Sequence, residues 1–399
     1  MRELRVKVVL FASTFSRLLM LAVGLAIPTA CQRATAVRQA RPSPAPLKEQ
    51  VAGRIDSAIA RAMRERDIPG ASLAVLCGDG VVLLRGYGTA DRERGTLVTP
   101  ETIFQIASLT KPFTAMAILL LVEAGTVDLD APADRYLGWL PGRYGAVTVR
   151  QLLQHTSGVA PDVRRANVDE MSESEFRQRF LDSPASFPPG TRWQYANTGY
   201  TLLSQIVERV SGEPFGQFLE RRIFAPLAMR STGYRVPEQS DARHAVGYDL
   251  VDGVLRRAPH VFSGWGNSGI ETTAADLARW ASAIHRGALL PASSYRIMFS
   301  PGRLAADTVL NFPFRDGRAA YGFGWFLMRY QGEPLISHGG AIAGFSSVLD
   351  RLPTRGWTVL VLSNGKQGVD RQGQAEAIAG VVLGELNTAG SECAREPSA

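Results

Sequence analysis

The spacing of apolar residues changes from helical to strand-like between residues 47 and 87. Leu47–Arg66 carries apolar residues on one face at helical intervals, which predicts a surface helix. Two apolar runs follow, Ala71–Cys77 and Val81–Tyr87, and residues 78–80 between them read Gly-Asp-Gly. Short apolar runs on either side of such a turn are typical of a β-hairpin. We therefore expect a helix and two antiparallel strands here.

The middle of the chain is predominantly helical, and strands return near its end. Helix starts of the capping-box type are predicted at Thr148, Ser172 and Thr273. Later patterns predict strands at 323–330, 334–337, 345–350 and 357–362, and a last helix at about 375–386. We expect an α+β fold in which an antiparallel sheet built from both chain ends is flanked by helices. A mostly helical domain would be inserted at about 106–315.

The first 30 residues have the organisation of an export signal. Basic residues at positions 2, 5 and 7 precede two apolar stretches, Val8–Phe15 and Leu18–Ile27, and small residues follow at Thr29 and Ala30. The uninterrupted apolar run is too short for a helix that spans a membrane. Residues 1–30 are therefore predicted to be a signal peptide.

The residues after this signal suggest how the protein is held in its compartment. Cys31 follows the predicted cleavage point and is a candidate lipidation site, although Pro28 stands where lipoprotein signals usually carry Leu. Residues 31–46 are rich in Pro, Ala and Arg and would form a tether. One folded domain over 47–388 and a disordered tail over 389–399 complete the expected organisation. We expect an exported protein, either periplasmic or anchored on the outer side of the cytoplasmic membrane through its leader or Cys31.

The positive charge of the chain does not indicate a nucleic-acid partner. The formal net charge is +7, but residues 1–50 hold eight Arg and Lys and two Asp and Glu, a net of +6. Only +1 remains for residues 51–399, and no basic stripe interleaved with aromatic residues is found there. The charge belongs to the leader.

Three cysteines do not make a disulfide framework. Cys77 lies inside an apolar run, so we expect it to be a small core residue. Cys393 lies in the polar tail. No thiol chemistry is expected from this pattern.

A serine and a lysine are placed where they can react together. The chain has 40 arginines and four lysines, and one of these lysines, Lys111, follows Ser108 by three residues. Lysine can lose its proton and act as a base, whereas arginine stays charged. Residues three apart share one face of a helix, and Pro112 with the apolar residues 113–122 places the pair at the start of a buried helix. This arrangement is typical of an activated serine nucleophile.

Two further segments carry groups that could complete such a site. Tyr195 and Asn197 lie on a loop before a predicted helix, where a phenol can move protons and an amide can hold Lys111 or a substrate carbonyl. Packing and helix capping are the alternative roles. His338 precedes two glycines at the end of a predicted strand, along which a substrate can approach closely. The other histidines are interpreted as structural, no metal-binding array is found, and we expect neither metal nor cofactor.

Taken in order, these motifs resemble those of the serine β-lactamase and penicillin-binding-protein superfamily. The matched motifs are Ser108-x-x-Lys111, Tyr195-x-Asn197 and His338-Gly339-Gly340. They are most similar to the class C-like branch of DD-peptidases, D-aminopeptidases and esterases. The segments 151–158, 187–190 and 338–346 also look similar, and the likeness spans roughly residues 50–385.

The resemblance implies a role for each matched residue. Ser108 would be the nucleophile that carries the acyl group, and Lys111 and Tyr195 would transfer protons, with either of them acting as the base in acylation. The backbone N–H groups of Ser108 and Ala341 would form the oxyanion hole. The substrate would be bound by Asn197, His338, Gly339 and Gly340.

The third motif departs from the pattern of β-lactamases, which usually carry Lys-Thr/Ser-Gly where this chain has His338 and Gly339. Losing the ammonium and the hydroxyl should weaken recognition of a substrate carboxylate by about 2–4 kcal/mol. The sequence therefore favours an exported esterase or peptidase acting on small acyl or D-aminoacyl substrates. A β-lactamase or DD-carboxypeptidase is the alternative. A non-catalytic penicillin- or peptide-binding surface protein is the alternative of another class.

Overall fold

The computed structural model describes residues 46–163, 171–234, 241–261, 265–314, 317–366, 373–388 and Cys393. The predicted signal peptide, Cys31, and nearly all of the predicted tether and tail lie outside these residues. Among the helices of the described segments, none is both long enough and apolar enough to cross a membrane.

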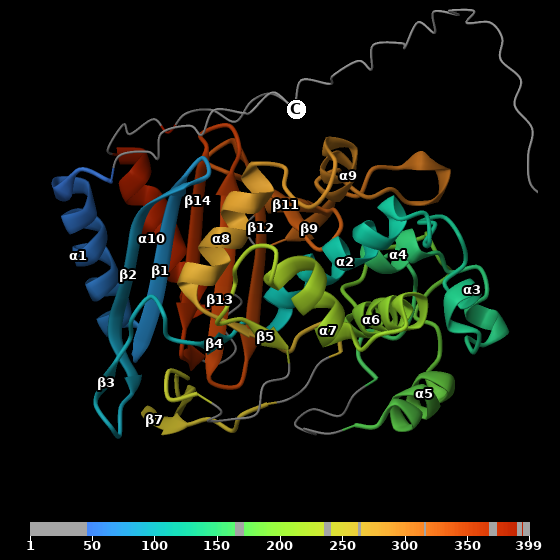
Figure 1. Ribbon diagram of the computed structural model, residues 1–399, viewed down its shortest axis with the longest axis horizontal. Helices are drawn as coiled ribbons and strands as arrows, with labels where there is room; N and C mark the ends of the chain where they lie inside the picture. Colours follow the sequence, from blue (N-terminus) through green and yellow to red (C-terminus); the bar gives the residue numbers. More distant parts are fainter. Residues whose placement is uncertain are drawn as a thin grey trace, which may run out of the picture. The chain divides into compact units, whose positions relative to one another are not determined.

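Both ends of the chain contribute to one antiparallel sheet, as the sequence predicts (Figure 1). Nine strands of the described segments pair in the order β3-β2-β1-β14-β13-β12-β11-β10-β9. Their bounds are β1 (Gly70–Cys77), β2 (Gly80–Asp91), β3 (Thr96–Leu97), β9 (Phe312–Phe314), β10 (Gly317–Tyr321), β11 (Phe326–Tyr330), β12 (Glu333–Ile342), β13 (Phe345–Leu352) and β14 (Trp357–Ser363). The predicted hairpin is therefore confirmed as β1 and β2, and it pairs directly with the last long strand, β14.

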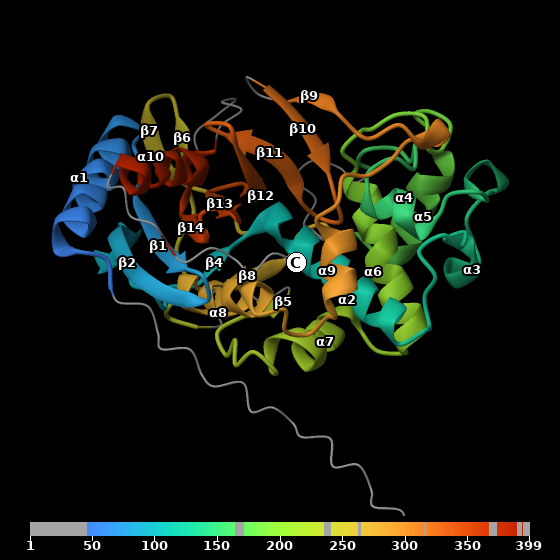
Figure 2. The ribbon, with the colours of Figure 1, turned by 90° about the horizontal axis from the view of Figure 1, so that it is seen from above.

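Helices cover both faces of this sheet (Figures 1 and 2). The predicted first and last helices, α1 (Glu49–Glu65) and α10 (Gln374–Thr388), pack together on one face, and α8 (Ala274–His285) packs on the other. Leu73 and Val75 of β1 join the core under α1 and α10, whereas Ala74 and Leu76 join the core that contains α2 and α8. Because both of its faces are buried, β1 is a continuous apolar run rather than an alternating one.

The helical region lies beside the strands β9 to β12 (Figure 2). Its helices are α2 (Lys111–Glu123), α3 (Asp134–Leu137), α4 (Val149–Leu153), α5 (Glu173–Asp182), α6 (Asn197–Ser211), α7 (Phe215–Leu219) and α9 (Ala292–Met298). The predicted caps are confirmed at Thr148, Ser172 and Thr273, whose side chains each accept the backbone N–H three residues later. At Thr148 the full capping box forms, because its own N–H also donates to Gln151 Oε1 at 3.0 Å.

The chain returns to the sheet earlier than the expected end of the helical domain near residue 315. Helix α8 lies within that range but packs against β1, β2 and β14. The range also contains two small sheets, one formed by β4 (Phe104–Gln105), β8 (Ile270–Thr272) and β5 (Gly233–Tyr234). The other is formed by β15 (Gly365–Lys366), β6 (Tyr248–Val251) and β7 (Val254–Arg257). Strands of two to four residues carry too little periodicity to be found by pattern.

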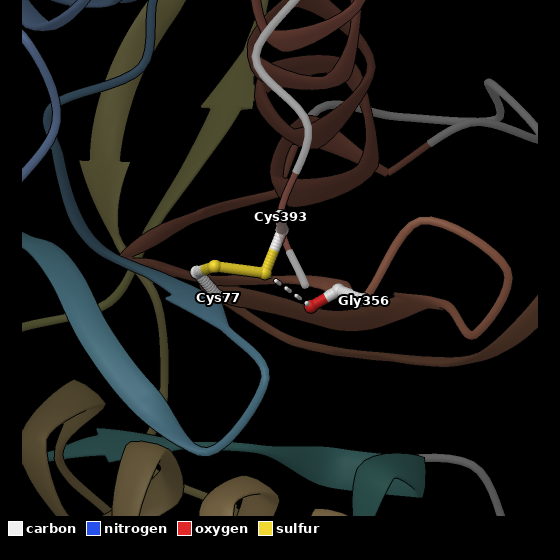
Figure 3. Close-up of a disulfide and its surroundings, with 3 residues drawn as sticks. All are labelled: Cys77, Gly356 and Cys393. Atoms are coloured by element: carbon white, nitrogen blue, oxygen red, sulfur yellow. Dashed lines mark hydrogen bonds between the residues drawn. A yellow bond between two sulfur atoms is a disulfide. The ribbon is translucent and has the colours of Figure 1, made fainter. Parts of the chain in front are cut away.

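The interpretation of the cysteines is wrong, because Cys77 and Cys393 form a disulfide across a sequence separation of 316 residues (Figure 3). Cys77 ends β1, and the chain beyond α10 returns to this strand end. Cys393 is 4% exposed and lies against the carbonyl oxygen of Gly356. Its polar surroundings in the sequence gave no sign of burial, and no spacing rule connects two cysteines so far apart.

Candidate active site

Ser108 lies on a tight turn between a short strand and a buried helix. Strand β4 ends at Gln105, the 3-10 turn Ala107–Thr110 follows, and α2 begins at Lys111. Side chains three residues apart are eclipsed in a 3-10 turn, so the Ser108 hydroxyl and the Lys111 amine lie on the same side. Ala107, directly before the serine, has a φ of 47°, in the left-handed region that costs a residue with a Cβ about 1–3 kcal/mol.

Contacts with two other elements hold this strained turn. The Ile106 N–H donates to the carbonyl oxygen of Ile270 in β8 at 3.1 Å. The Ser347 hydroxyl of β13 donates to the Ile106 carbonyl oxygen at 2.8 Å. The backbone before Ser108 is therefore fixed by a small sheet on one side and the main sheet on the other. Such fixing preorganises a nucleophile.

Lys111 is fully buried and lies within hydrogen-bond distance of three oxygen atoms. Its Nζ lies 3.1 Å from Ser108 Oγ, 2.9 Å from Asn197 Oδ1 and 2.9 Å from the Asn267 carbonyl oxygen. The two amide oxygens can only accept hydrogen bonds, so they take two N–H groups of the lysine. The third position faces a hydroxyl, which can accept from an ammonium or donate its proton to a free amine. This geometry lets Lys111 take the Ser108 proton.

Asn197 joins Lys111 to the loop before α6. It is the first residue of that helix, and Ala196 before it makes no side-chain cap, so the capping alternative is wrong. The Asn197 amide nitrogen donates to Asp162 Oδ2 at 3.0 Å, which directs its oxygen toward Lys111. Sequence reasoning found Asn197 but missed Asp162, which no motif marks.

Tyr195 lies beside both catalytic candidates. Its ring centroid is 4.7 Å from Lys111 Nζ, and a hydrogen bond joins its hydroxyl to Ser108. Burial raises the pKa of Tyr195 well above its usual range, and the hydrogen bond with Ser108 opposes this only in part. At neutral pH the phenol therefore keeps its proton and is placed to donate it.

We predicted a structural role for His155 from the sequence. In the structure, its ring packs against the loop that carries Tyr195. Its Nδ1 accepts the Ala196 N–H at 3.1 Å, and its ring centroid lies 4.5 Å from that of Tyr195. Burial, with the charge of Lys111 second, holds the pKa of His155 well below its usual range. A neutral His155 supports the loop and adds no positive charge beside Lys111.

His338 of β12 is buried and neutral. The Tyr321 hydroxyl donates to its Nε2 at 3.1 Å, and its Nδ1 lies 2.7 Å from the Gly339 carbonyl oxygen. Burial lowers the pKa of His338 to about 3, and the nearby charge of Lys111 acts in the same direction. The third motif therefore supplies no positive charge at neutral pH. Tyr321 was missed, since a lone tyrosine in a strand carries no signal.

The two glycines of the motif face different neighbours. A Cβ at Gly340 would overlap the Ile106 carbonyl oxygen and lie 2.9 Å from the Ser108 nitrogen, so glycine lets β12 pass directly beside the nucleophile turn. A Cβ at Gly339 would instead lie 2.7 Å from Glu376 Oε1 of α10. Of the two glycines, Gly340 is thus the one in contact with the reactive serine.

One edge of β12 is open beside the serine. Strand β11 pairs with β12 only as far as the Phe326–Ser337 pair, whereas β13 accompanies β12 to Ile342. In the described segments no strand covers residues 338–342 on the β11 side. An extended substrate could lie along this edge. The oxyanion-hole assignment of Ser108 and Ala341 stays a prediction that fits this approach.

Asn267 is a further group near the nucleophile that sequence reasoning missed, and a signal for it existed. Its carbonyl accepts from Lys111, and its side-chain amide donates to Thr201 Oγ1 of α6 at 3.0 Å. Gly266 and Gly269 on either side have φ of 75° and 105°. A glycine-bounded segment of this kind marks a backbone that closely approaches another element. No group of three or more metal-ligating side chains is found in the described segments.

Comparison with known proteins shows the family of this chain. The family model described as Beta-lactamase matches residues 55–383, and the chain belongs to this family, within the serine β-lactamase and penicillin-binding-protein superfamily. A penicillin-binding protein of Bacillus subtilis (strain 168) is 31% identical over 330 residues, which cover 75% of this chain and 69% of that protein. Protein flp of Staphylococcus aureus (strain COL) is 26% identical, and the match covers 78% of this chain but 62% of the relative's length.

Two solved structures show the same fold. The octameric penicillin-binding protein homologue from Pyrococcus abyssi has a TM-score of 0.73 and 28% identity, over 84% of this chain and 77% of that one. The D-amino acid amidase from Ochrobactrum anthropi SV3, complexed with L-phenylalanine amide, has a TM-score of 0.73 and 27% identity, over 86% of this chain and 100% of that one. The predicted fold and family are therefore confirmed.

Proposed function

We propose that this protein is a serine hydrolase that forms an acyl-enzyme on Ser108 and acts as an esterase or peptidase on small acyl or D-aminoacyl substrates. The observation that carries the proposal is the Lys111 amine, which lies 3.1 Å from the Ser108 hydroxyl with its two other partners restricted to accepting. A purely structural lysine would not need a reactive hydroxyl as its third partner. The hydrolytic family of the chain supports the same reaction class.

In acylation, Ser108 Oγ attacks the substrate carbonyl carbon and its proton passes to Lys111 Nζ. The carbonyl oxygen becomes an oxyanion, which the N–H groups of Ser108 and Ala341 would stabilise. Collapse of this intermediate breaks the bond to the leaving group, which takes a proton from Tyr195. Lys111 then passes the proton that it took from Ser108 to Tyr195, which restores the phenol, so that in net terms one proton has moved from the enzyme's serine to the alcohol or amine released.

In deacylation, a water molecule attacks the acyl ester and gives a proton to Lys111. The bond between the acyl carbon and Ser108 Oγ breaks, Lys111 passes the proton from water to Ser108 Oγ, and the acid is released. The raised pKa of Tyr195 and the placement of Lys111 favour the lysine as base and the phenol as proton donor in this cycle. Neither step needs a metal or a cofactor.

The substrate class follows from the third motif. The neutral His338 and the side-chain-free Gly339 leave no ammonium or hydroxyl for a carboxylate at these two positions. Esters and amides without a carboxylate beside the scissile bond therefore fit better than β-lactams. The D-amino acid amidase, whose full length is matched by 86% of this chain, supports small aminoacyl amides as a second substrate group.

Covalent labelling tests the proposal directly. A fluorophosphonate probe should label the purified domain, and Ser108→Ala should abolish the label while circular dichroism shows an intact fold. A short-chain p-nitrophenyl ester should give a burst followed by steady turnover. A burst without turnover would indicate an acylated trap, and neither burst nor turnover would favour the alternative of a binding protein.

We also propose that the protein is exported, with Cys31 as a candidate lipid anchor. The disulfide between Cys77 and Cys393 supports this, because disulfides persist mainly in oxidising compartments. Cys31→Ser should release a membrane-bound form as soluble exported protein. Full-length protein recovered from the cytosol would contradict export.

A further inference from the structure

Four aromatic side chains form a partly exposed surface beside the proposed active site. We call Trp193, Phe312, Phe314 and Phe326 the aromatic wall; they come from the loop before α6, from β9 and from β11. None of the four is fully buried. Large rings usually bury their surface, so four neighbouring rings left partly open to solvent mark a place where a ligand can cover them.

Stacking makes the aromatic wall one continuous unit. The Trp193 and Phe312 rings are 3.7 Å apart between centroids and nearly parallel, at 10°. Phe314 and Phe326 stack at 4.6 Å, and Phe326 lies 6.3 Å from Trp193. The rings thus support one another's orientation, and a flat group that binds here would meet preformed aromatic surface.

Phe326 connects the aromatic wall to the reactive groups. Its ring is parallel to that of Tyr195, at 8° and 6.3 Å, and its centroid lies 5.4 Å from that of His338. Phe326 also makes the last strand pair before β12 becomes open, opposite Ser337. The aromatic wall therefore begins where the open edge beside the nucleophile begins.

The proton route decides which part of the substrate meets the aromatic wall. Tyr195 must reach the leaving-group atom to protonate it, and its ring lies against Phe326. The wall is thus on the leaving-group side of the scissile bond. On this side the third motif contributes the neutral His338, whose ring centroid lies 5.4 Å from that of Phe326.

We propose that the aromatic wall is a leaving-group subsite for an aromatic alcohol or amine, so that the preferred substrates are benzyl-type or aryl esters and amides. This rests on the proposed function and specifies its substrate class. Packing of a substrate ring against the exposed parts of Phe326 and Phe314 replaces the electrostatic recognition that the third motif lacks. Covering a phenyl ring on such a surface corresponds to about a 10- to 100-fold gain in kcat/KM.

Kinetics with matched esters test the subsite. Benzyl and methyl esters of the same acid differ in the ring and share an alkyl alcohol as leaving group. The wild-type protein should show a benzyl-to-methyl ratio of kcat/KM of about 30, and Phe314→Ala and Phe326→Ala should each lower the ratio at least 5-fold. Phe314→Leu should lower it too, since it keeps the apolar bulk but removes the ring. Phe299→Ala, a partly exposed phenylalanine outside the wall, should leave the ratio unchanged.

A wild-type ratio near 1, or a ratio unaltered in all three wall variants, would overturn the subsite while leaving the hydrolase proposal intact. A second measurement reads the subsite without turnover. 4-Nitrobenzyl alcohol should quench the emission of Trp193 in a saturable way in Ser108→Ala protein, and Trp193→Phe should remove that component. If no ester were hydrolysed, saturable quenching would still support the aromatic subsite, and its absence would refute it.

Discussion

The proposed site has two ends that differ in their side chains: the region around Ser108 is polar, and the third motif around His338 is surrounded by aromatic rings. Around Ser108, polar groups contact one another: the buried Lys111 lies near three oxygen atoms, and the partly exposed Asn197 is held by Asp162. At the third motif, on β12, the histidine is neutral and aromatic rings surround it. In the proposed reaction the first end carries the groups that break and form bonds, and the second faces the leaving group. We therefore propose that the chain keeps the chemistry of its family and differs in substrate recognition.

The largest loss of activity is expected from a change at Lys111, in the end of the site around Ser108. Lys111→Arg keeps the charge but removes the group that can accept a proton, so acylation by a p-nitrophenyl ester should fall by at least about 10²-fold in stopped-flow assays. Lys48→Arg makes the same change at an exposed position before α1 and should have no effect. Near-wild-type activity of the Lys111 variant would show that this lysine is only a structural charge.

A smaller loss of activity is expected from a change at Gly340, where β12 contacts the turn that carries Ser108. In Gly340→Ala the new methyl group would overlap the Ile106 carbonyl oxygen and press on the Ser108 nitrogen. We expect a loss of about 1–3 kcal/mol in the free energy of unfolding and a roughly 10-fold lower kcat/KM for every substrate. Gly380→Ala, on α10 with open space around it, should be neutral or slightly stabilising in the same thermal melts. Equal thermal stability and equal kcat/KM of the two variants would show that β12 does not need a glycine beside the nucleophile.

The neutral histidine predicts a pH dependence of stability. The pKa of His338 is about 3 in the folded protein, against an ordinary value near 6.5, so between these pH values the unfolded chain binds a proton that the folded chain does not. Stability should therefore fall as the pH is lowered from 6.5 toward 3, by up to about 1.4 kcal/mol per pH unit from this residue. His338→Gln should make that decline shallower in urea titrations at several pH values. An unchanged slope would mean that His338 is not buried in its neutral form.

The smallest effect on the site is expected from the disulfide. It ties the end of β1 to the chain beyond α10 and has no contact with the proposed catalytic residues. Cys77→Ser should lower the free energy of unfolding by about 2–4 kcal/mol and leave kcat/KM for esters and β-lactams within about 2-fold. Mass spectrometry with and without reductant measures the bond itself. A change in kcat/KM for only one of the two substrate classes would show that the disulfide at the end of β1 affects substrate binding at the third motif.

What the sequence could predict followed from local patterns. The hairpin, the terminal helices and the cap at Thr148 depend on spacing and turn chemistry within a few residues, and the three motifs are short. The disulfide depends on which distant segments meet, and no local pattern records that. The glycines around Asn267 mark a close approach of the backbone but do not say that the partner is Lys111. The aromatic wall lay beyond sequence reasoning for the same reason. Trp193 and Phe312 are 119 positions apart by their numbers, yet their rings stack.

One measurement tests the central claim most directly. The claim is that this chain retains the chemistry of its family but lacks the side chains that recognise a substrate carboxylate. The wild-type kcat/KM for a short-chain p-nitrophenyl ester is compared with that for a penicillin and a cephalosporin under the same conditions. The loss of roughly 3 kcal/mol of carboxylate recognition predicts a ratio of at least about 10² in favour of the ester. Hydrolysis of either β-lactam at a rate rivalling the ester would contradict this account and place the β-lactamase alternative first.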